Sequence, residues 1–134
     1  MASILRVNTL TDASSNNSVP IATVASGSAK AIGTIDTDTD NSIDFSFNIA
    51  SYTDRATGSL YGNFTNNMGS ATGYTVLGSP SPVEPSTMNT TNSNRTIICC
   101  ADTAARFSSN GFSDSDNTMR DLNAHSNAVY GDLA

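Results

Sequence analysis

Hydrophobic residues recur at every second position in several short runs of this chain, which is the pattern of a β-strand with one buried face. The clearest run spans residues 42–53, which we expect to form one long strand. Its apolar side chains should face a core and its polar side chains should face water, as in an antiparallel sheet. The apolar set is Ile43, Phe45, Phe47 and Ile49, and the polar set is Asp44, Ser46 and Asn48.

Other strand-like runs follow at short intervals, separated by residues that favour turns. We expect a central strand at Thr96–Ala101, which is apolar on both faces, and a turn-rich piece at 108–117. In 59–64, Leu60, Gly62 and Phe64 should share one face, with Tyr61 on the other. Seven or eight such strands predict an all-β fold, an antiparallel β-sandwich with a jelly-roll-like connection. The remaining runs are Ala31–Asp36, Tyr74–Gly78, Met119–Leu122 (a short strand or turn) and Asn127–Leu133.

The first 26 residues hold two short extended runs, Ile4–Leu10 and Val19–Val24, with DASSNN between them. Pro20 lacks an amide donor, which confines the second run to an edge or an interchain position. A lone hairpin is marginally stable. We therefore interpret 1–26 as an attachment arm that docks on a neighbouring copy or a larger particle, and 27–134 as the head domain. The anchoring side chains are expected to be Ile4, Leu5, Val7, Leu10, Val19 and Ile21.

The composition supports a neutral, polar, sheet-rich surface. More than a third of the 134 residues are Ser, Thr or Asn, whereas Lys and Glu each occur once. Such surfaces are common on extracellular and virion proteins. Only 37% of the residues are hydrophobic. Because small domains often gain stability by oligomerisation, we expect further apolar area to be buried between copies of the chain.

The net charge of -6 disfavours nucleic acid as a partner, since the six basic residues are scattered rather than gathered on one face. No apolar run is long enough to span a bilayer. The opening residues lack the apolar stretch of a signal peptide. We expect assembly in a bacterial cytoplasm and release by lysis.

Residues 79–95 contain three of the four prolines and no periodicity, which predicts a long exposed excursion. Loop side chains of this kind often carry specificity, so we place the candidate receptor contacts here. They are Met88, Asn89, Asn92, Asn94 and Arg95. Aromatic rings also bind sugars, but for residues on strands core packing is the better interpretation. The aromatic set is Tyr52, Tyr61, Tyr74, Tyr130, Phe64, Phe107 and Phe112.

The sequence contains no pattern that selects a catalytic site. His125 is the sole histidine, and Asp121 lies four residues before it, but no serine occupies a nucleophile elbow. We expect no enzymatic activity and no cofactor. Cys99 and Cys100 are neighbours on an expected strand, so their thiols should point to opposite faces and remain free and packed.

An acidic run offers oxygen ligands at the spacing found early in calcium loops. It consists of Asp36, Asp38, Asp40, Asn41 and Asp44. The turn glycine of an EF-hand is replaced by Asn41, and Phe47 stands where the closing carboxylate would be. A solvated turn is the preferred interpretation, with calcium at most a structural accessory.

Three segments together resemble one family. The opening SILRVNTLTDASSNNSVPIATVASGSAKA, the internal IASYTDRATGSLYGNFTNNM and the ending AVYGDLA are similar to small fibre or appendage proteins of tailed bacteriophages of marine and freshwater bacteria, of the cyanophage and pelagiphage type. Two features depart from that pattern: Ile32 stands where the family carries Trp, and an Asp-rich turn replaces a Gly-rich one. Residues 79–123 match nothing in it.

The resemblance implies a virion structural protein, a homotrimer with an N-terminal attachment arm and a C-terminal β-sandwich head. The expected partners are other phage tail or capsid proteins and a host cell-surface glycan. Neutral sugars suit this chain better than anionic envelopes do. The alternative is a capsid decoration or cement protein, whose arm clamps neighbouring shell subunits and whose head adds stability. A polysaccharide depolymerase is a third hypothesis, which the lack of a catalytic pattern disfavours.

Overall fold

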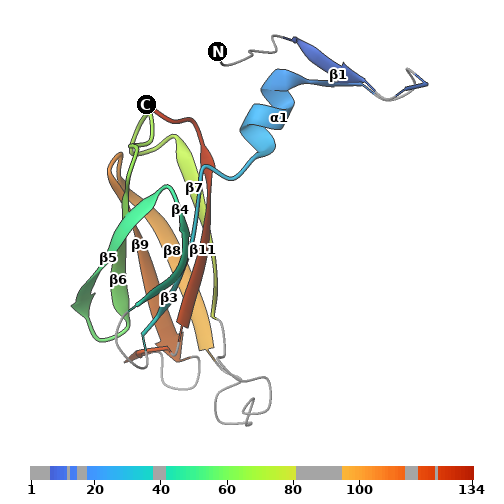
Figure 1. Ribbon diagram of the computed structural model, residues 1–134. Helices are drawn as coiled ribbons and strands as arrows, with labels where there is room; N and C mark the ends of the chain where they lie inside the picture. Colours follow the sequence, from blue (N-terminus) through green and yellow to red (C-terminus); the bar gives the residue numbers. More distant parts are fainter. Residues whose placement is uncertain are drawn as a thin grey trace.

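The computed structural model describes residues 7–11, 13–14, 18–37, 42–80, 95–113, 118–122 and 124–134. These residues form two antiparallel sheets packed face to face, with an arm attached at one end (Figure 1). The predicted all-β sandwich is therefore confirmed. The arm comprises β1 (Thr9–Thr11), β2 (Ser18–Pro20) and α1 (Ile21–Gly27). The head comprises β3 (Ala31–Asp36), β4 (Ile43–Phe47), β5 (Ile49–Ala56), β6 (Ser59–Phe64), β7 (Tyr74–Pro80), β8 (Arg95–Thr103), β9 (Arg106–Ser113), β10 (Thr118–Met119) and β11 (Ala124–Gly131).

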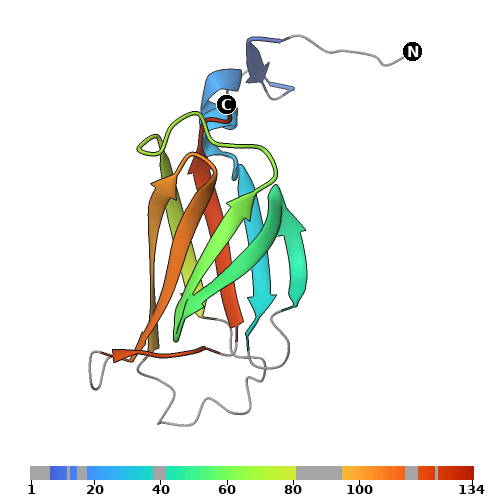
Figure 2. The same ribbon diagram turned by 90° about the vertical axis from the view of Figure 1, so that its left-hand side faces the viewer.

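The first sheet has the order β4-β3-β11-β7, so the first and last long strands of the head lie side by side at its centre. In the second sheet β5 pairs β6, β6 pairs β9, and β9 also pairs β8 and the short β10. Figure 2, turned by 90°, shows the two layers. The alternation of Ser59–Phe64 placed Leu60 and Phe64 on the buried face and Tyr61 on the other, as predicted.

Aromatic rings fill the space between the sheets. Phe64 contacts the rings of both Tyr74 and Phe107, with centroids 5.6 and 5.5 Å apart, and Tyr52 meets Phe107 edge to face. Tyr74, on the first sheet, also reaches the β8–β9 turn of the second: its hydroxyl lies 2.6 Å from the Arg106 carbonyl oxygen and accepts a hydrogen bond from the Asp102 amide. The core-packing interpretation is thus confirmed for Tyr52, Tyr74, Phe64 and Phe107.

The run predicted as one strand over 42–53 is two strands on different sheets. Asn48 separates β4 from β5 and has a left-handed backbone conformation, with φ of 56°. Its side-chain amide donates to the carbonyl oxygens of Lys30 and Asn66, and its Oδ1 accepts from the Asn66 amide. These bonds hold the chain where it leaves the first sheet for the second.

The predicted inward face of that run was also wrong for three of its four apolar residues. Only Ile49 is buried, whereas Ile43, Phe45 and Phe47 are exposed. Phe47 pairs with Ile32 on β3, and directly paired residues share a face. The inner face of β3 carries Ala31, Gly33 and Ile35 instead. Phe45 and Phe47 therefore lie on the outside of the sandwich, because they pair with residues of the other face of β3. Ile43 pairs with Ile35 beyond a register shift and is nevertheless exposed.

Two further expectations need correction. Ser108–Ser113, predicted as turn-rich, continue β9, because Phe107, Ser109 and Gly111 lie on its buried side and small side chains fit between the sheets there. Thr96–Ala101 was predicted to be central, but among the described strands β8 pairs only with β9. Its outward Ile98 is accordingly exposed.

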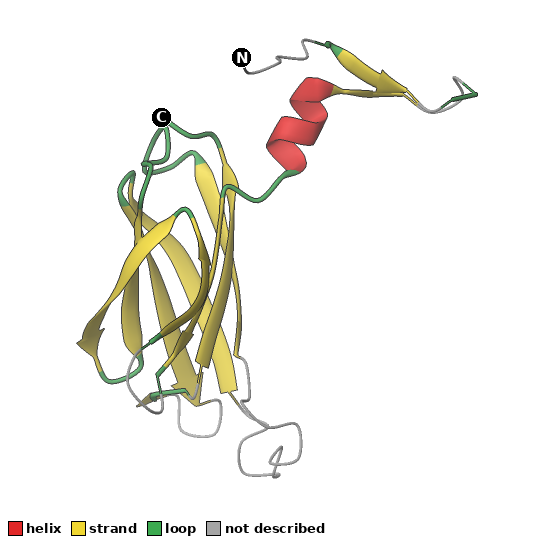
Figure 3. Ribbon diagram, viewed as in Figure 1, coloured by secondary structure: helices red, strands yellow, loops and turns green. Residues whose placement is uncertain are grey.

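The Val19–Val24 run is extended only to Pro20, and Ile21–Gly27 form a helix between the hairpin and the sandwich (Figure 3). The β2 backbone pairs with β1 alone. Past Pro20, two serine side chains donate to carbonyl groups of the helix: Ser26 Oγ donates to Ala22 O and Ser28 Oγ to Val24 O. Local hydrogen bonds therefore outweigh the β preference of Val24 in this segment.

Candidate contact surfaces

The arm meets the head at one end of the sandwich only. The Lys30 amide donates to Val129 O over 2.7 Å, and the Lys30 ammonium group donates to Ala25 O at the end of α1. None of the seven described residues of α1 is buried. The described residues of the arm thus add no side chain to the head core.

The arm's described apolar side chains are mostly turned to solvent. Val7, Leu10 and Val19 are exposed, and Ile21 is half-buried at the start of α1. The other two predicted anchoring residues, Ile4 and Leu5, lie outside the described residues. Val7, Leu10 and Val19 are therefore not covered by the head of the same chain.

The opposite end of the sandwich carries the ends of the long 79–95 segment. Pro80, the last residue of β7, pairs with His125 at the beginning of β11, whereas Ala31 pairs with Val129 near its end. Arg95 begins β8 opposite Ser113, again at the end away from the arm (Figure 1). The candidate receptor contacts Met88, Asn89, Asn92 and Asn94 lie outside the described residues, and only the backbone position of Arg95 is described.

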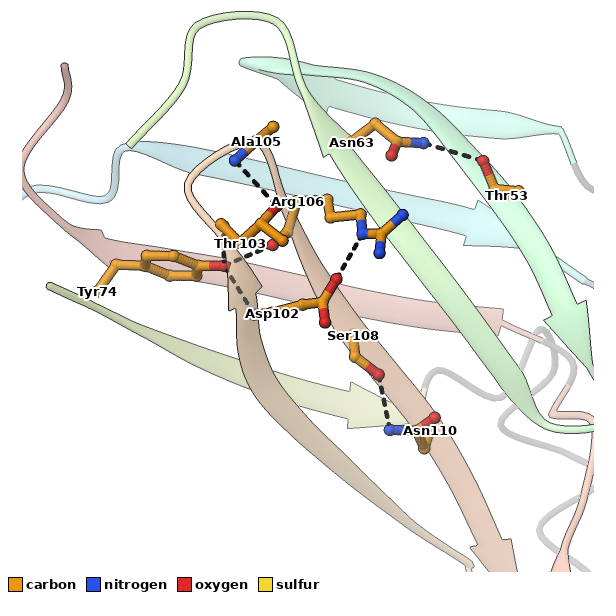
Figure 4. A network of polar contacts seen from close by, with 9 residues as sticks. All are labelled: Thr53, Asn63, Tyr74, Asp102, Thr103, Ala105, Arg106, Ser108 and Asn110. Atoms are coloured by element: carbon orange, nitrogen blue, oxygen red, sulfur yellow. Dashed lines mark hydrogen bonds and ion pairs between the residues drawn. The ribbon is translucent and has the colours of Figure 1, made fainter. Parts of the chain in front are cut away.

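The outer side of the second sheet presents a cluster that we call the polar face: Arg55, Tyr61, Asn63, Asp102 and Arg106. The Arg106 guanidinium carbon lies 4.1 Å from the centre of the Tyr61 ring, and that of Arg55 lies 5.2 Å from it. Arg106 also forms an ion pair with Asp102 (Figure 4). The Tyr61 ring and the two guanidinium groups packed on it form a flat surface, and the guanidinium groups give that surface hydrogen-bond donors.

Amide and hydroxyl groups extend the polar face along the same strands. Asn63 Nδ2 donates to Thr53 Oγ1 over 3.0 Å and to Ser51 Oγ over 3.1 Å. Asn110 Nδ2 donates to Ser108 Oγ (Figure 4), and Asn110 Oδ1 accepts from Ser59 Oγ, but both serines are buried. The amide and hydroxyl groups of Asn63 and Thr53 are of the kind that a hydroxyl-rich ligand uses.

The sequence did not identify the polar face, although one signal was present. Alternation placed Tyr61 on the outside, but Arg106 joins it only because β6 pairs with β9 in a register that sets Asn63 opposite Arg106. That pairing links positions more than forty residues apart in the sequence. Periodicity within one strand therefore located the ring and not its neighbours.

The sole histidine belongs to a buried polar cluster. His125 Nδ1 lies 3.0 Å from Ser109 Oγ, and Asn127 Nδ2 donates to Ser109 Oγ over 3.1 Å. Ser109 is fully buried and His125 is 1% exposed, so this serine–histidine pair faces the core rather than solvent. Burial lowers the pKa of His125 to about 4, with Asp121 acting weakly in the opposite direction.

Asp121, the residue noted for its closeness to His125 in sequence, has a structural contact of its own. Its carboxylate accepts a hydrogen bond of 2.5 Å from the Gly58 amide in the β5–β6 turn. Gly58 has a φ of 72°, which suits glycine. Asp121 therefore holds that turn, and no alignment of a nucleophile, His125 and this carboxylate is formed.

The two cysteines diverge as predicted, and neither is in a disulfide. Cys99 is half-buried beside Asn127, whose amide donates to its Sγ over 3.3 Å, and burial raises the pKa of its thiol. Cys100 is exposed, which contradicts the expectation that both thiols are packed. It lies opposite Ser108 on the outer side of the second sheet.

Of the acidic run, Asp38, Asp40 and Asn41 lie outside the described residues. Among the described His, Cys, Asp and Glu residues, no group of three or more is close enough to hold a metal ion. In the described part of the chain, no helix combines the length and the apolar content needed to cross a membrane. Comparison with protein-family models, with curated proteins and with solved structures found no match.

Proposed function

We propose that this chain is a structural protein of a phage virion, a fibre or appendage subunit that is anchored by its arm and presents its β-sandwich head to the host surface. The observation that carries the proposal is the separation of the two ends. The arm joins the sandwich where β3 begins, and the 79–95 segment starts and ends at the other pole, at Pro80 and Arg95. A tethered head exposes its far pole and its sides.

The arm suits anchoring because its described side chains contribute nothing to the head core. Its apolar side chains Val7, Leu10 and Val19 are exposed, so burying them against a virion protein would gain free energy without unfolding the head. The resemblance of its opening residues to phage appendage proteins supports the same role.

The polar face and the far pole suit weak contacts with a glycan. The guanidinium groups of Arg55 and Arg106 and the amide of Asn63 offer hydrogen-bonding groups for the hydroxyl groups of a sugar. Several heads on one particle would strengthen individually weak contacts through multivalency. Neutral sugars fit best, because the net charge of -6 opposes anionic envelopes.

The test is to locate the chain in intact phage particles by electron microscopy. A few symmetric copies on the tail or its fibres would support the proposal. Hundreds of copies at regular capsid positions would favour the capsid decoration protein instead, which would use the same exposed arm as a clamp. Absence of the chain from purified particles would refute both virion roles.

A further inference from the structure

An apolar row crosses the outside of the first sheet. Phe47 on β4 pairs with Ile32 on β3, Ile32 pairs with Ala128 on β11, and Ala128 pairs with Leu77 on β7. Since directly paired residues project to the same side, these side chains form one continuous band over all four strands of the sheet. Phe45 extends the band along β4. Ile43 lies beyond a register shift and pairs with the buried Ile35, so it is not part of the band. We call Ile32, Phe45, Phe47 and Leu77 the apolar face.

These side chains are large and open to solvent in the single chain. Phe45 is 56% exposed, Phe47 54% and Leu77 57%, with Ile32 somewhat less exposed. From the usual areas of such side chains, the four present roughly 400 Å² of contiguous apolar surface, which is as large as the biggest patches on ordinary monomers. Patches of this size are often functional.

The fold of the single chain does not need this face. The inner sides of the same strands already supply core residues, among them Ala31, Ile35, Val76 and Val129. The register of β4 on β3 directs Phe45 and Phe47 outward, and a shift by one residue would turn them to the other side. The pairing thus retains two large phenylalanine rings on the outer surface of the single chain.

The surroundings of the apolar face favour another copy of the chain as its partner. With a net charge of -6, two copies repel one another over most of their surfaces. The row next to the band consists of Phe45, Thr34, Ser126 and Ser79, which are uncharged. Thr34 and Ser126 satisfy one another through a hydrogen bond of 3.2 Å. Two copies can therefore meet here without opposing like charges.

The area fits as well. A standard interface buries about 800 Å² per partner, and in homodimers about 65% of it is apolar. The apolar face supplies most of that requirement, and the neutral row beside it supplies polar surroundings. We propose that a second copy of this chain docks on the apolar face, with Phe45 and Phe47 of neighbouring copies meeting near the symmetry axis. The proposal does not depend on the virion role.

The full chain should therefore be oligomeric in solution, as measured by analytical ultracentrifugation over a dilution series. Replacing both rings, Phe45→Ser with Phe47→Ser, should weaken association by at least about 100-fold. The reason is that the loss of each ring removes the free energy gained when that ring is buried in the interface. The matched control is Ile98→Ser with Met119→Ser, which removes exposed apolar side chains from the second sheet. This control should associate as the unchanged chain does.

A second measurement does not depend on how the serine variant folds. A photoreactive benzophenone side chain at position 47 should crosslink two copies through peptides of β3 or β4, and the same group at position 98 should not. A monomeric full chain at every concentration would overturn the proposal. So would association that survives loss of both rings, or crosslinks from position 47 that reach only the arm or other proteins.

Discussion

Ser109 lies at the centre of the buried polar cluster, where three other side chains converge on it. His125, Asn127 and Cys99 all lie within hydrogen-bonding distance of its hydroxyl, and the Tyr52 hydroxyl donates to Asn127 Oδ1 over 3.3 Å. Among the described side chains, no buried nitrogen or oxygen atom lacks a partner. A cluster satisfied in this way adds specificity to a core that has few large apolar residues.

The first prediction concerns pH and His125. Its pKa is about 4 in the folded chain and about 6.5 when unfolded, so below pH 6.5 the unfolded chain takes up a proton that the folded chain does not. The free energy of unfolding should therefore fall as the pH falls from about 6.5 to about 4, by up to about 3 kcal/mol. Urea denaturation across this range measures the slope.

The control for this prediction is His125→Gln, which keeps an amide near Ser109 and removes the titrating ring. Aspartates titrate in both proteins, so the difference between the two pH profiles isolates His125. Equal slopes in the two proteins would contradict the assigned cause.

The second prediction concerns Gly62, where a β-carbon would overlap the ring of Phe107. Phe107 is fully buried and cannot withdraw, so Gly62→Ala should lower the free energy of unfolding by about 1–3 kcal/mol. Gly27→Ala is the matched control, because nothing lies within 4 Å of a β-carbon there. Chemical denaturation measures the free energy of unfolding of both variants. A Gly62→Ala protein as stable as the control would contradict the prediction, because it would mean that the Phe107 ring can move to make room for the β-carbon.

At the scale of elements, the junction at Asn48 decides which sheet each half of the 42–53 run joins. The left-handed φ breaks the alternation, so that Phe47 lies outside the sandwich and Ile49 inside it. Sequence alternation cannot reveal this, because Asn48 continues the polar positions of the pattern. The left-handed conformation is stabilised by hydrogen bonds from the Asn48 side chain to Lys30 and Asn66, both distant in sequence.

The third prediction tests this junction. Asn48→Ala loses the side-chain hydrogen bonds, and alanine tolerates the left-handed conformation less well than asparagine does, so the change should cost about 2–4 kcal/mol of stability. Asn48→Gly loses the same bonds but suits the φ, so it should be less destabilising than Asn48→Ala by about 1 kcal/mol.

Asn67→Ala serves as the control for the junction, because its side chain is exposed, and it should leave the thermal midpoint nearly unchanged. If the glycine and alanine variants of Asn48 were equally stable, the backbone conformation would carry no part of the cost.

At the scale of the whole molecule, the arm and the sandwich are separable. Described core residues begin at Ala31, and the contacts between arm and head are few. The expected boundary at residues 26 and 27 coincides closely with the end of α1 at Gly27. The two parts can therefore serve different partners without sharing side chains.

The fourth prediction follows from this separation. The thermal midpoint of a chain that begins at residue 28 should lie within about 5 °C of that of the full chain. For a domain of this size, such a shift corresponds to a loss of less than about 1 kcal/mol in the free energy of unfolding. A chain that begins at residue 37 lacks β3, a central strand of the first sheet, and should not fold. Calorimetry measures both, and a large loss of stability in the first would mean that the arm packs on the head in solution.

The amino-acid sequence alone determined the fold class and the positions of most strands, and it predicted a division into arm and head. These features depend on local chemistry, because period-two alternation, turn residues and Pro20 affect only the backbone a few residues to either side. The outward position of Tyr61 and the divergence of Cys99 and Cys100 followed from the same local rule.

Only the tertiary structure decided which face of β4 is buried, that β9 runs through a turn-like stretch, and that Tyr61 gathers Arg55 and Arg106 around it. Each of these depends on strand pairing between distant segments, and pairing is selected by the total packing of both sheets rather than by any one strand. The alternation in 42–53 states that one side is apolar. Whether that side meets its own core or another copy of the chain is a property of the assembled sheets.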